Sequence, residues 1–353
     1  MEHSGGDEPE PGAHPGATVR RWGVRVVIYG PGAVGGTIGG RLAQHGHDVA
    51  LIARGAHGEA IGRDGLRLRT PDGDHVLRLP VVDRPGALSL GAGDVVVLAM
   101  KTQHTEAALD DLAAAAPADL PVVCAQNGVE NERLALRRFA NVHAMCVMLP
   151  GTHLEPGVVV AHGAPRSGIL DLGRYPSGVD DVDEEVAAAL DGAGFSSRAD
   201  PAVLRRKYAK LLMNLGNALE AACGAAARTS ELGARARREA LACYSAAGID
   251  AATQEEDTER RGDLVAIAPV EGKARGGGSS WQSLARGTGS VEADHLNGEI
   301  VLLGRLRGVA TPVNELLRQT ANAMARAREP AGSRAVEQLE AALGGGPAGS
   351  APR

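Results

Sequence analysis

The sequence predicts an α/β N-terminal Rossmann-type domain with a doubly wound parallel sheet, followed by an all-α C-terminal domain. Three observations predict this: a glycine-rich segment joins a short apolar run to a helix-like stretch, further apolar runs alternate with helix-like stretches, and the sequence becomes Ala- and Leu-rich after about residue 200. Short buried strands alternating with helices are typical of a parallel sheet. We expect the Rossmann-type domain over 23–200 and the helical substrate and catalytic domain over 201–342, with disordered tails at 1–22 and 343–353.

Composition excludes several classes of function. The 353 residues carry a net charge of −6 and only 2% aromatic side chains, which argues against a nucleic-acid surface or an anionic membrane as partner. No apolar run is long enough to span a membrane, and the N-terminus lacks the apolar segment of a signal peptide. The four cysteines stand far apart, as is usual for thiols in a reducing compartment. We therefore expect a cytoplasmic protein that acts on a small molecule.

The expected elements follow in chain order. In the first domain the apolar runs predict strands at 24–29, 48–53, 94–100 and 121–125, with helices at 37–45 and 105–115. In the second domain, helix-rich stretches at 202–250 and 288–342 flank a polar insert at 255–278. Thr311-Pro312 is typical of a helix that begins with an N-cap and a proline in its first turn.

The first loop carries a dinucleotide fingerprint. Gly30-x-Gly32-x-x-Gly35 follows a strand, opens a helix and precedes a second strand. In such loops the first glycine makes the tight turn, the second admits a pyrophosphate, and the third packs the helix on the strand. We predict cofactor contacts at Gly30, Gly32, Ala33, Val34 and Gly35; the alternative is a turn that happens to be glycine-rich.

The end of the second strand indicates which dinucleotide is bound. NAD sites place a carboxylate there, whereas this chain has Arg54 and no carboxylate before Glu59. An arginine can pair with a 2′-phosphate, so we predict NADP(H). The alternative is a solvated arginine just past a strand.

Two polar residues follow the next predicted strands. Lys101 comes directly after the third strand, and Asn127 follows the fourth and precedes Gly128. Ligands in open α/β sheets bind at the carboxyl ends of strands, so both residues are predicted to lie beside the cofactor crevice. The alternative is that both are ordinary polar residues at strand ends.

A polar stripe runs along the helix predicted after residue 202. At about 100° per residue, its members fall within an arc of ~80°: Lys207, Lys210, Asn214 and Asn217. Asparagine is a mediocre helix former, so two of them beside Lys210 favour a face that binds a ligand. The alternative is a solvated surface stripe.

Several motifs together point to one family. The first half contains Gly-Pro-Gly-Ala-Val-Gly-Gly at 30–36, Ile-Ala-Arg at 52–54, Met-Lys-Thr-Gln at 100–103 and Gln-Asn-Gly-Val at 126–129. The second half contains Lys210-x-x-x-Asn214, Ser279-Ser280 and Glu292-x-Asp294-x-x-Asn297-Gly298, with twelve residues from Ser280 to Glu292. In these motifs the sequence resembles the ketopantoate reductases (2-dehydropantoate 2-reductases).

The resemblance implies an NADPH-dependent reduction of a 2-oxo acid, above all of 2-dehydropantoate to (R)-pantoate in pantothenate and coenzyme A biosynthesis. It implies that Lys210 is the general acid, that Glu292 binds substrate hydroxyl groups, and that the substrate's polar groups are held by Asn127, Asn214 and Ser280. Lys101 and Asn127 would also meet the cofactor. Burial would lower the pKa of Lys210 and Glu292 would raise it, and the sequence does not decide which effect prevails.

The chain also departs from the family pattern. The family's second asparagine falls at Ala218, and we expect Asn217, one residue earlier, to replace it as a substrate-binding residue. Trp281 places a large ring beside Ser280, and the polar insert lengthens the approach to the cleft. These departures leave open a reductase of another branched 2-oxo acid, a related 3-hydroxy-acid dehydrogenase, or a non-catalytic NADP-binding sensor.

We predict no metal site, because no histidine has a partner at ligand spacing. The histidines interpreted as structural or solvated are His104, His153, His162 and His295. The resemblance suggests a monomer or a homodimer formed through the helical domain.

Overall fold

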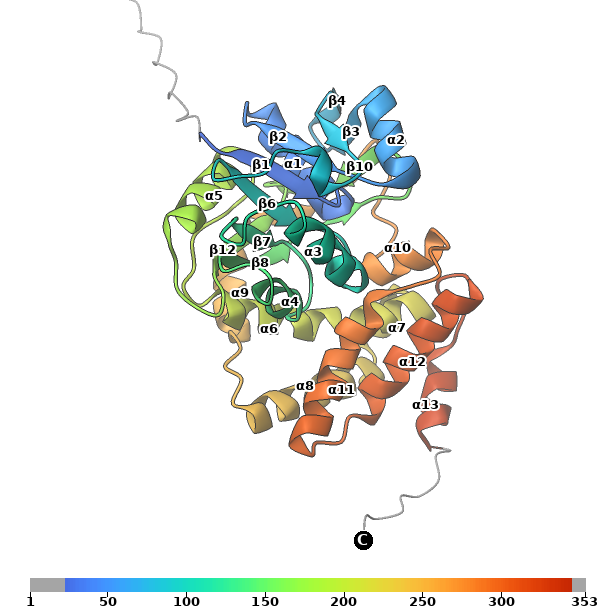
Figure 1. Cartoon of the computed structure of the whole chain (residues 1–353). Helices are drawn as coiled ribbons and strands as arrows, with labels where there is room; N and C mark the ends of the chain where they lie inside the picture. Colours follow the sequence, from blue (N-terminus) through green and yellow to red (C-terminus); the bar gives the residue numbers. More distant parts are fainter. Residues whose placement is uncertain (1–22, 345–353) are drawn as a thin grey trace, which may run out of the picture.

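The structure, a computed structural model, describes residues 23–344; the predicted N-terminal tail and residues 345–353 lie outside this range. An α/β part forms the upper half of Figure 1 and a group of helices the lower half, which confirms the predicted fold class. None of the described helices is both long and apolar enough to cross a membrane.

A seven-stranded sheet forms the centre of the α/β part. Its strand order is β12-β8-β7-β6-β1-β2-β5, and every neighbouring pair is parallel except β12 with β8. The strands are β1 Arg25–Tyr29, β2 Val49–Ile52, β5 Val81–Val82, β6 Asp94–Leu98, β7 Val122–Cys124, β8 Val142–Met148 and β12 Ile169–Arg174. The chain leaves β1 for β2 on one side and reaches β6 on the other, so the ligand crevice of such sheets falls at the carboxyl end of β1.

Helices cover both faces of this sheet. Val26 and Ile28 of β1 pack in a core with α1 (Ala33–Gln44) and α5 (Asp181–Gly192). Val27 and Tyr29 point into the other core, formed with α3 (Thr105–Ala113) and α4 (Asn131–Leu136). Burial on both faces explains why these strands are continuous apolar runs in the sequence.

Apart from β1, β2, β6 and β7, the strands of the α/β part were not predicted from the sequence. A second sheet has the order β4-β3-β10-β9, from β3 Leu66–Thr70, β4 Gly73–Leu77, β9 Gly151–Thr152 and β10 Val158–Ala161. Strand β4 is largely exposed and mostly polar, so it lacks the apolar run by which a buried strand is recognised. The helix α2 (Gly55–Asp64) connects β2 to this sheet.

The helical part packs around a core of its own, which includes Leu219, Leu317 and Met324. Its helices are α6 Val203–Asn214, α7 Gly216–Cys223, α8 Glu231–Ala247, α10 Ser279–Ala285, α11 Asn297–Arg307, α12 Pro312–Ala327 and α13 Val336–Gly344. Helix α12 begins at Pro312 as predicted, but the Thr311 side chain does not cap it. The Glu239 carboxylate accepts from the backbone N–H groups of Val313 and Asn314 instead.

The two parts are interlocked. Val203 of α6 packs against Ala144 and Cys146 of β8. The polar insert forms α9 (Gln254–Arg261) and β13 (Val265–Ile267), and β13 pairs with β11 (Gly163–Pro165) of the α/β part. Arg260 of α9 also binds Asp171 of β12, with nitrogen–oxygen distances of 2.6 and 2.7 Å. The insert is therefore fastened to the large sheet.

Candidate active site

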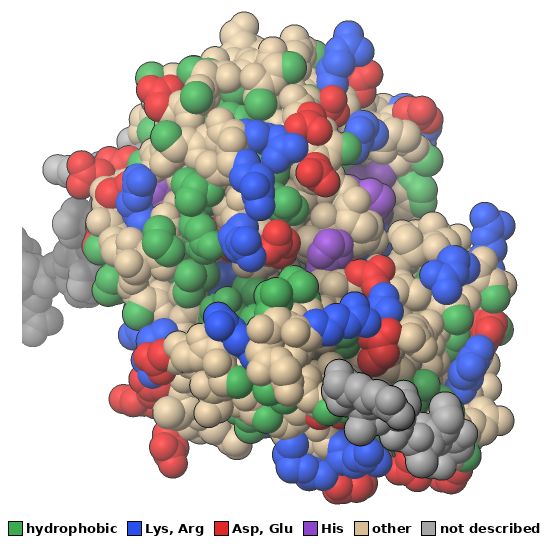
Figure 2. Space-filling model, turned by 60° about the horizontal axis from the view of Figure 1, so that its bottom comes forward, with side chains coloured by type: hydrophobic (Ala, Val, Ile, Leu, Met, Phe, Trp, Pro, Cys, Tyr) green, Lys and Arg blue, Asp and Glu red, His purple; other side chains and the backbone are tan. Residues whose placement is uncertain are grey.

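A cavity of about 930 Å³ lies between the carboxyl ends of the central strands and the helical part. Its lining comes from the loop after β1, the ends of β2, β6 and β7, helices α6, α7 and α10, and the insert. Figure 2 shows one face of the molecule, on which basic side chains gather around a hollow near the centre. The cavity is large enough to accept a dinucleotide and a small substrate together.

The glycine loop forms one end of the cavity. Gly30 has φ +89° and lies so close to Met100 that a Cβ would come within 2.8 Å of the Met100 backbone nitrogen. A Cβ on Gly35 would meet Ile28 and Ala99 at 2.8 Å, so this glycine packs α1 on the sheet and does not itself line the cavity. Gly32 caps α1 without a side-chain hydrogen bond, which leaves the N–H groups of the first turn available to an anion.

The end of β2 carries the predicted arginine. Arg54 lines the cavity, is about half exposed (54% for its side chain), and its nearest carboxylate is that of Asp111 at 3.8 Å. A contact this long between exposed groups is weak. The Arg54 guanidinium can therefore turn towards a phosphate that binds at the carboxyl end of β2.

Two histidines in ring contact border the glycine loop, and neither was predicted from the sequence to be part of the site. The rings of His57 and His153 lie 4.2 Å apart between centroids. His57 Nε2 donates to the Pro31 carbonyl while Nδ1 accepts from the Gly157 N–H, which defines a neutral ring. Burial lowers the pKa of both, that of His153 to about 4. The pair therefore adds shape but no charge near neutral pH.

Lys101 and Glu292 meet at the contact between the two parts. Lys101 Nζ donates to Ser283 Oγ and, at 3.4 Å, to the Ser279 carbonyl. Glu292 accepts from the Thr102 N–H at 3.2 Å and from Ser279 Oγ at 3.1 Å. Burial lowers the pKa of Lys101, and Glu292 opposes this effect. These contacts join the strand-end loop after β6 to α10.

Lys210 lies at the opposite end of the cavity and has one hydrogen-bond partner among the described residues, Asn214 Oδ1 at 2.9 Å. The Asn214 Nδ2 group is buried and has no partner among them. Burial lowers the pKa of Lys210 to about 8; Cys146 opposes this effect, while three nearby guanidiniums lower the pKa further. They belong to Arg261, Arg228 and Arg275.

The pKa question that the sequence left open is therefore decided by burial. Glu292 acts on Lys101, and it is not among the charges that shift the pKa of Lys210.

The other members of the predicted stripe have different surroundings. Lys207 is buried, and its ammonium contacts Glu132 Oε1 at 2.5 Å, the Gln126 carbonyl at 3.0 Å and the Met145 carbonyl at 3.3 Å. An ion pair and two hydrogen bonds to carbonyl oxygens hold this ammonium, so Lys207 joins α6 to the sheet and does not line the cavity. Asn217 does line it, and its Oδ1 accepts from Arg228 at 2.8 Å.

The remaining predicted residues divide in the same way. Asn127 and Glu292 line the cavity, whereas Ser280 is buried within α10 and does not. Its neighbour Ser279 lines the cavity instead. Ala218 packs in the helical core and leaves the neighbouring Asn217 at the cavity wall.

Sequence reasoning missed four arginines of the cavity wall: Arg228, Arg261, Arg275 and Arg286. Two of them come from the insert, which was recognised only as a polar stretch. A polar segment that contains arginines and ends in a glycine run is a weak signal, because solvated loops have the same composition.

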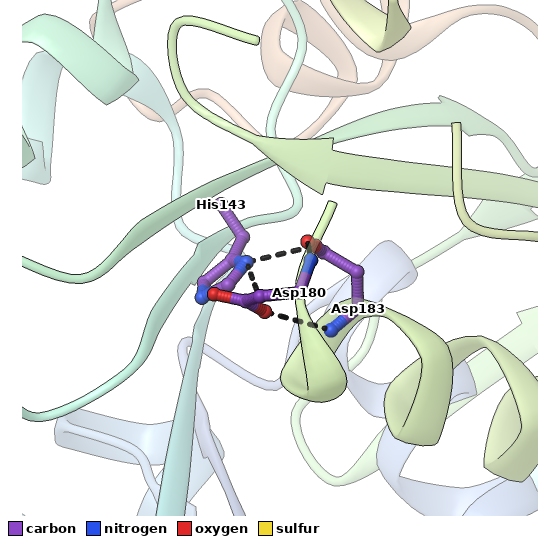
Figure 3. A group of neighbouring side chains, drawn as sticks. All are labelled: His143, Asp180 and Asp183. Carbon is purple, nitrogen blue, oxygen red and sulfur yellow. Dashed lines mark hydrogen bonds and ion pairs between the residues drawn. The ribbon is translucent and has the colours of Figure 1, made fainter. Parts of the chain in front are cut away.

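One group outside the cavity has the composition of a metal site. His143, Asp180 and Asp183 place ligand atoms close together, as Figure 3 shows. His143 Nδ1 donates to Asp183 Oδ1 at 2.7 Å, and Asp180 and Asp183 form a capping box at the start of α5. These atoms already satisfy the N–H groups of the helix, so the group serves to cap α5 and fasten it to β8.

The fold and the cavity define a dinucleotide-dependent oxidoreductase, since the glycine loop opens into the same space as a buried lysine and an unsatisfied amide. Residues 26–177 match the family model described as ketopantoate reductase PanE/ApbA, and residues 202–325 match the model of its C-terminal part. The chain belongs to the ketopantoate reductase family, whose members are nicotinamide-dinucleotide-dependent reductases.

Individual relatives agree with this membership. A 2-dehydropantoate 2-reductase of Pyrococcus horikoshii is 28% identical over 304 residues, which cover 83% of this chain and 95% of that protein. The crystal structure of a PanE/ApbA family ketopantoate reductase from Ralstonia eutropha JMP134 has a TM-score of 0.73 and 30% identity, and the match covers 87% of this chain and all of that one. D-mandelate dehydrogenase with NADH and anilino(oxo)acetate has the same fold at a TM-score of 0.74 and 22% identity, with 86% and 99% covered.

Proposed function

We propose that the protein catalyses the NADPH-dependent reduction of a 2-oxo acid to a 2-hydroxy acid. The substrate named in its relatives, 2-dehydropantoate, is the first candidate, with pantothenate and coenzyme A biosynthesis as the pathway. The observation that carries this proposal is Lys210, an ammonium group with one partner in a cavity that also contains the glycine loop. Bound NADPH would supply the hydride.

The lysine suits the role of proton donor. Reduction of a carbonyl creates negative charge on its oxygen, and an ammonium at hydrogen-bond range can both stabilise that charge and transfer a proton. A pKa of about 8 keeps Lys210 charged at neutral pH and makes its proton easier to transfer than that of an exposed lysine. Asn214 Oδ1 fixes the direction of Nζ, and the unsatisfied Asn214 Nδ2 can donate to the substrate.

The other polar residues of the wall have complementary roles in this proposal. Asn217 Oδ1 is bound by Arg228, which leaves the Asn217 NH2 group to donate to a substrate oxygen. Asn127 lies where the cofactor and the substrate would meet, at the end of β7. Glu292 and Lys101 would face the cofactor side, as their contacts with Thr102 and Ser279 indicate.

The cofactor is proposed to be NADP(H) because of Arg54. The residues that follow β2, Ala53 and Arg54, provide no carboxylate to accept from the ribose hydroxyls of NAD. A half-exposed guanidinium whose one ion pair among residues 23–344 is 3.8 Å long can bind a 2′-phosphate through charge-assisted hydrogen bonds. The glycine loop can hold the pyrophosphate at the start of α1.

The test is an absorbance assay of NADPH and NADH oxidation. It uses 2-dehydropantoate and a panel of other branched 2-oxo acids. Turnover with NADPH preferred over NADH is the expected result. Binding of NADPH without its oxidation on any 2-oxo acid would contradict the proposal and favour the alternative of a non-catalytic NADP sensor.

Two further expectations remain predictions. A cytoplasmic location is consistent with four cysteines that are all free. A homodimer through the helical part follows from the family resemblance and is checked by light scattering of the full chain.

A further inference from the structure

We propose that Arg275 binds the carboxylate of the 2-oxo acid substrate, whose polar groups the family resemblance assigns to Asn127, Asn214 and Ser280. This inference rests on the proposed function, because it takes the reaction of Lys210 with a 2-oxo acid as given. The chemistry requires a carboxylate holder next to the proton donor, since in a 2-oxo acid the carboxylate is bonded directly to the carbonyl carbon.

One of these three predicted residues does not reach the cavity. Ser280 is 2% exposed, is enclosed by the helical part and does not line the cavity. Ser279 does line it, but its hydroxyl donates to Glu292. An additional group must therefore hold the substrate's charge at the end of the cavity where Lys210 lies.

Arg275 is at that end of the cavity. It lines the wall, and its charge acts on Lys210 and is itself acted on by Glu220 and Arg228. Arg286, by contrast, acts on Lys101 and donates to the His153 carbonyl, which places it towards the glycine loop. The two arginines therefore act on different lysines of the cavity wall.

The neighbouring arginines already have anionic partners. Arg228 donates to Glu220 Oε2 at 2.8 Å and to Asn217 Oδ1, and Arg261 contacts Asp257 Oδ2 at 2.7 Å. Arg275 makes no ion pair or hydrogen bond with any residue that the structure describes, and its Nε is buried and unsatisfied. Burial lowers its pKa, which is the sign of a guanidinium that lacks sufficient compensation.

An unpaired and partly buried cation is unfavourable unless a ligand completes it. A carboxylate does so in the best geometry available, because it accepts two parallel N–H bonds from the guanidinium fork.

The segment that carries Arg275 is held firmly. The Trp281 ring covers the two glycines after it so closely that a Cβ at Gly277 would lie 2.6 Å from the Trp281 Cγ. The Gly278 N–H donates to Glu220 Oε1 at 3.0 Å, and Gln282 Nε2 donates to the Gly277 carbonyl at 3.1 Å. Trp281 and the glycines at the end of the insert thus position an arginine at the cavity wall.

The first measurement is steady-state kinetics of Arg275→Met, with Arg275→Lys as the conservative variant and Lys273→Met as the matched control. Lys273 is exposed on the same segment and does not line the cavity. We expect Arg275→Met to raise the KM for the 2-oxo acid about 10- to 100-fold with kcat nearly unchanged, because a charged hydrogen bond made equally in substrate and transition state is lost. Arg275→Lys should fall between, and Lys273→Met should match the unmodified protein. A normal KM in Arg275→Met, or a fall in kcat alone, would overturn the proposal.

The second measurement is calorimetric binding to the NADP-loaded protein, and it does not depend on turnover. Oxamate carries a carboxylate beside a carbonyl, and oxamide is its neutral counterpart. The protein should bind oxamate more tightly than oxamide, and Arg275→Met should remove this difference while binding oxamide as before. An unchanged preference in Arg275→Met would refute the role of Arg275.

The two measurements separate the two proposals. Turnover with a KM that does not depend on Arg275 would leave the reductase and exclude the anchor. Oxamate binding that requires Arg275, without turnover of any 2-oxo acid, would retain the anchor and exclude the reductase.

Discussion

The two ends of the cavity are built by different means. The cofactor end is formed mainly by two short continuous segments, Tyr29–Val34 and Ala99–His104, and it offers backbone N–H groups, two neutral histidines and a half-exposed arginine. The substrate end gathers one lysine and three arginines from α6, the segment after α7 and the insert. A dinucleotide is recognised mostly by shape and backbone, whereas a small anion needs charges placed around it.

The largest expected effect is a loss of catalysis without a loss of cofactor binding. Lys210→Ala removes the proton donor, and kcat should fall about a thousandfold, within the usual 10²- to 10⁴-fold range for a general acid. The Kd for NADPH, measured by fluorescence titration, should change by no more than about twofold. The reason is that Lys210 forms a hydrogen bond only with Asn214 among the described residues. Loss of cofactor binding in this variant would show that the two ends are not separate.

The next effect concerns the packing of α6 on the sheet and not the cavity. Lys207→Met leaves the buried Glu132 carboxylate without its cation, and breaking a buried pair costs ~3–5 kcal/mol of unfolding free energy. Urea unfolding measures this loss. The control is Lys207→Met with Glu132→Leu, which replaces both charges by apolar groups and should recover most of the stability. If the single variant is as stable as the unmodified protein, Lys207 does not stabilise the packing of α6 on the sheet.

A smaller effect sharpens the description of the cofactor end. Arg54→Gln should raise the KM for NADPH about tenfold and leave the KM for NADH unchanged, since only NADPH carries the 2′-phosphate. The expected rise in the KM for NADPH is modest because the Arg54 side chain is half exposed, and water weakens its interaction with the phosphate. Arg84→Gln, at an exposed arginine outside the cavity, is the matched control. Equal changes for both cofactors would place Arg54 outside the phosphate site.

The smallest effect is a pH dependence. The general acid must be protonated, and burial lowers the pKa of Lys210 to about 8. The value of kcat/KM should therefore be constant below that pH and fall about tenfold per pH unit above it. Initial rates in buffers of constant ionic strength measure this profile. If kcat/KM begins to fall only near the ordinary pKa of an exposed lysine, Lys210 is not buried as the structure describes.

The cofactor end was largely predictable from the sequence. Gly30 and Gly32 are two residues apart in the chain and both line the cavity, and Lys101 comes three residues after the end of β6. Helical periodicity also brought Lys210, Asn214 and Asn217 together. The same periodicity included Lys207, because an angle around a helix does not distinguish a cavity from a contact with a sheet.

The sequence by itself determined the Rossmann-type domain, the helical domain and the glycine loop, because each depends on local periodicity and on residues a few positions apart. Only the tertiary structure decided that the charge of Glu292 acts on Lys101, that Ser279 and not Ser280 meets the cavity, and that the charge of Arg275 acts on Lys210. The physical reason is that charge interactions fall off with distance in space and not along the chain. Packing joins residues that are far apart in the sequence. Thr102 and Glu292, for example, form a hydrogen bond although 190 positions separate them, and no local sequence pattern indicates that contact.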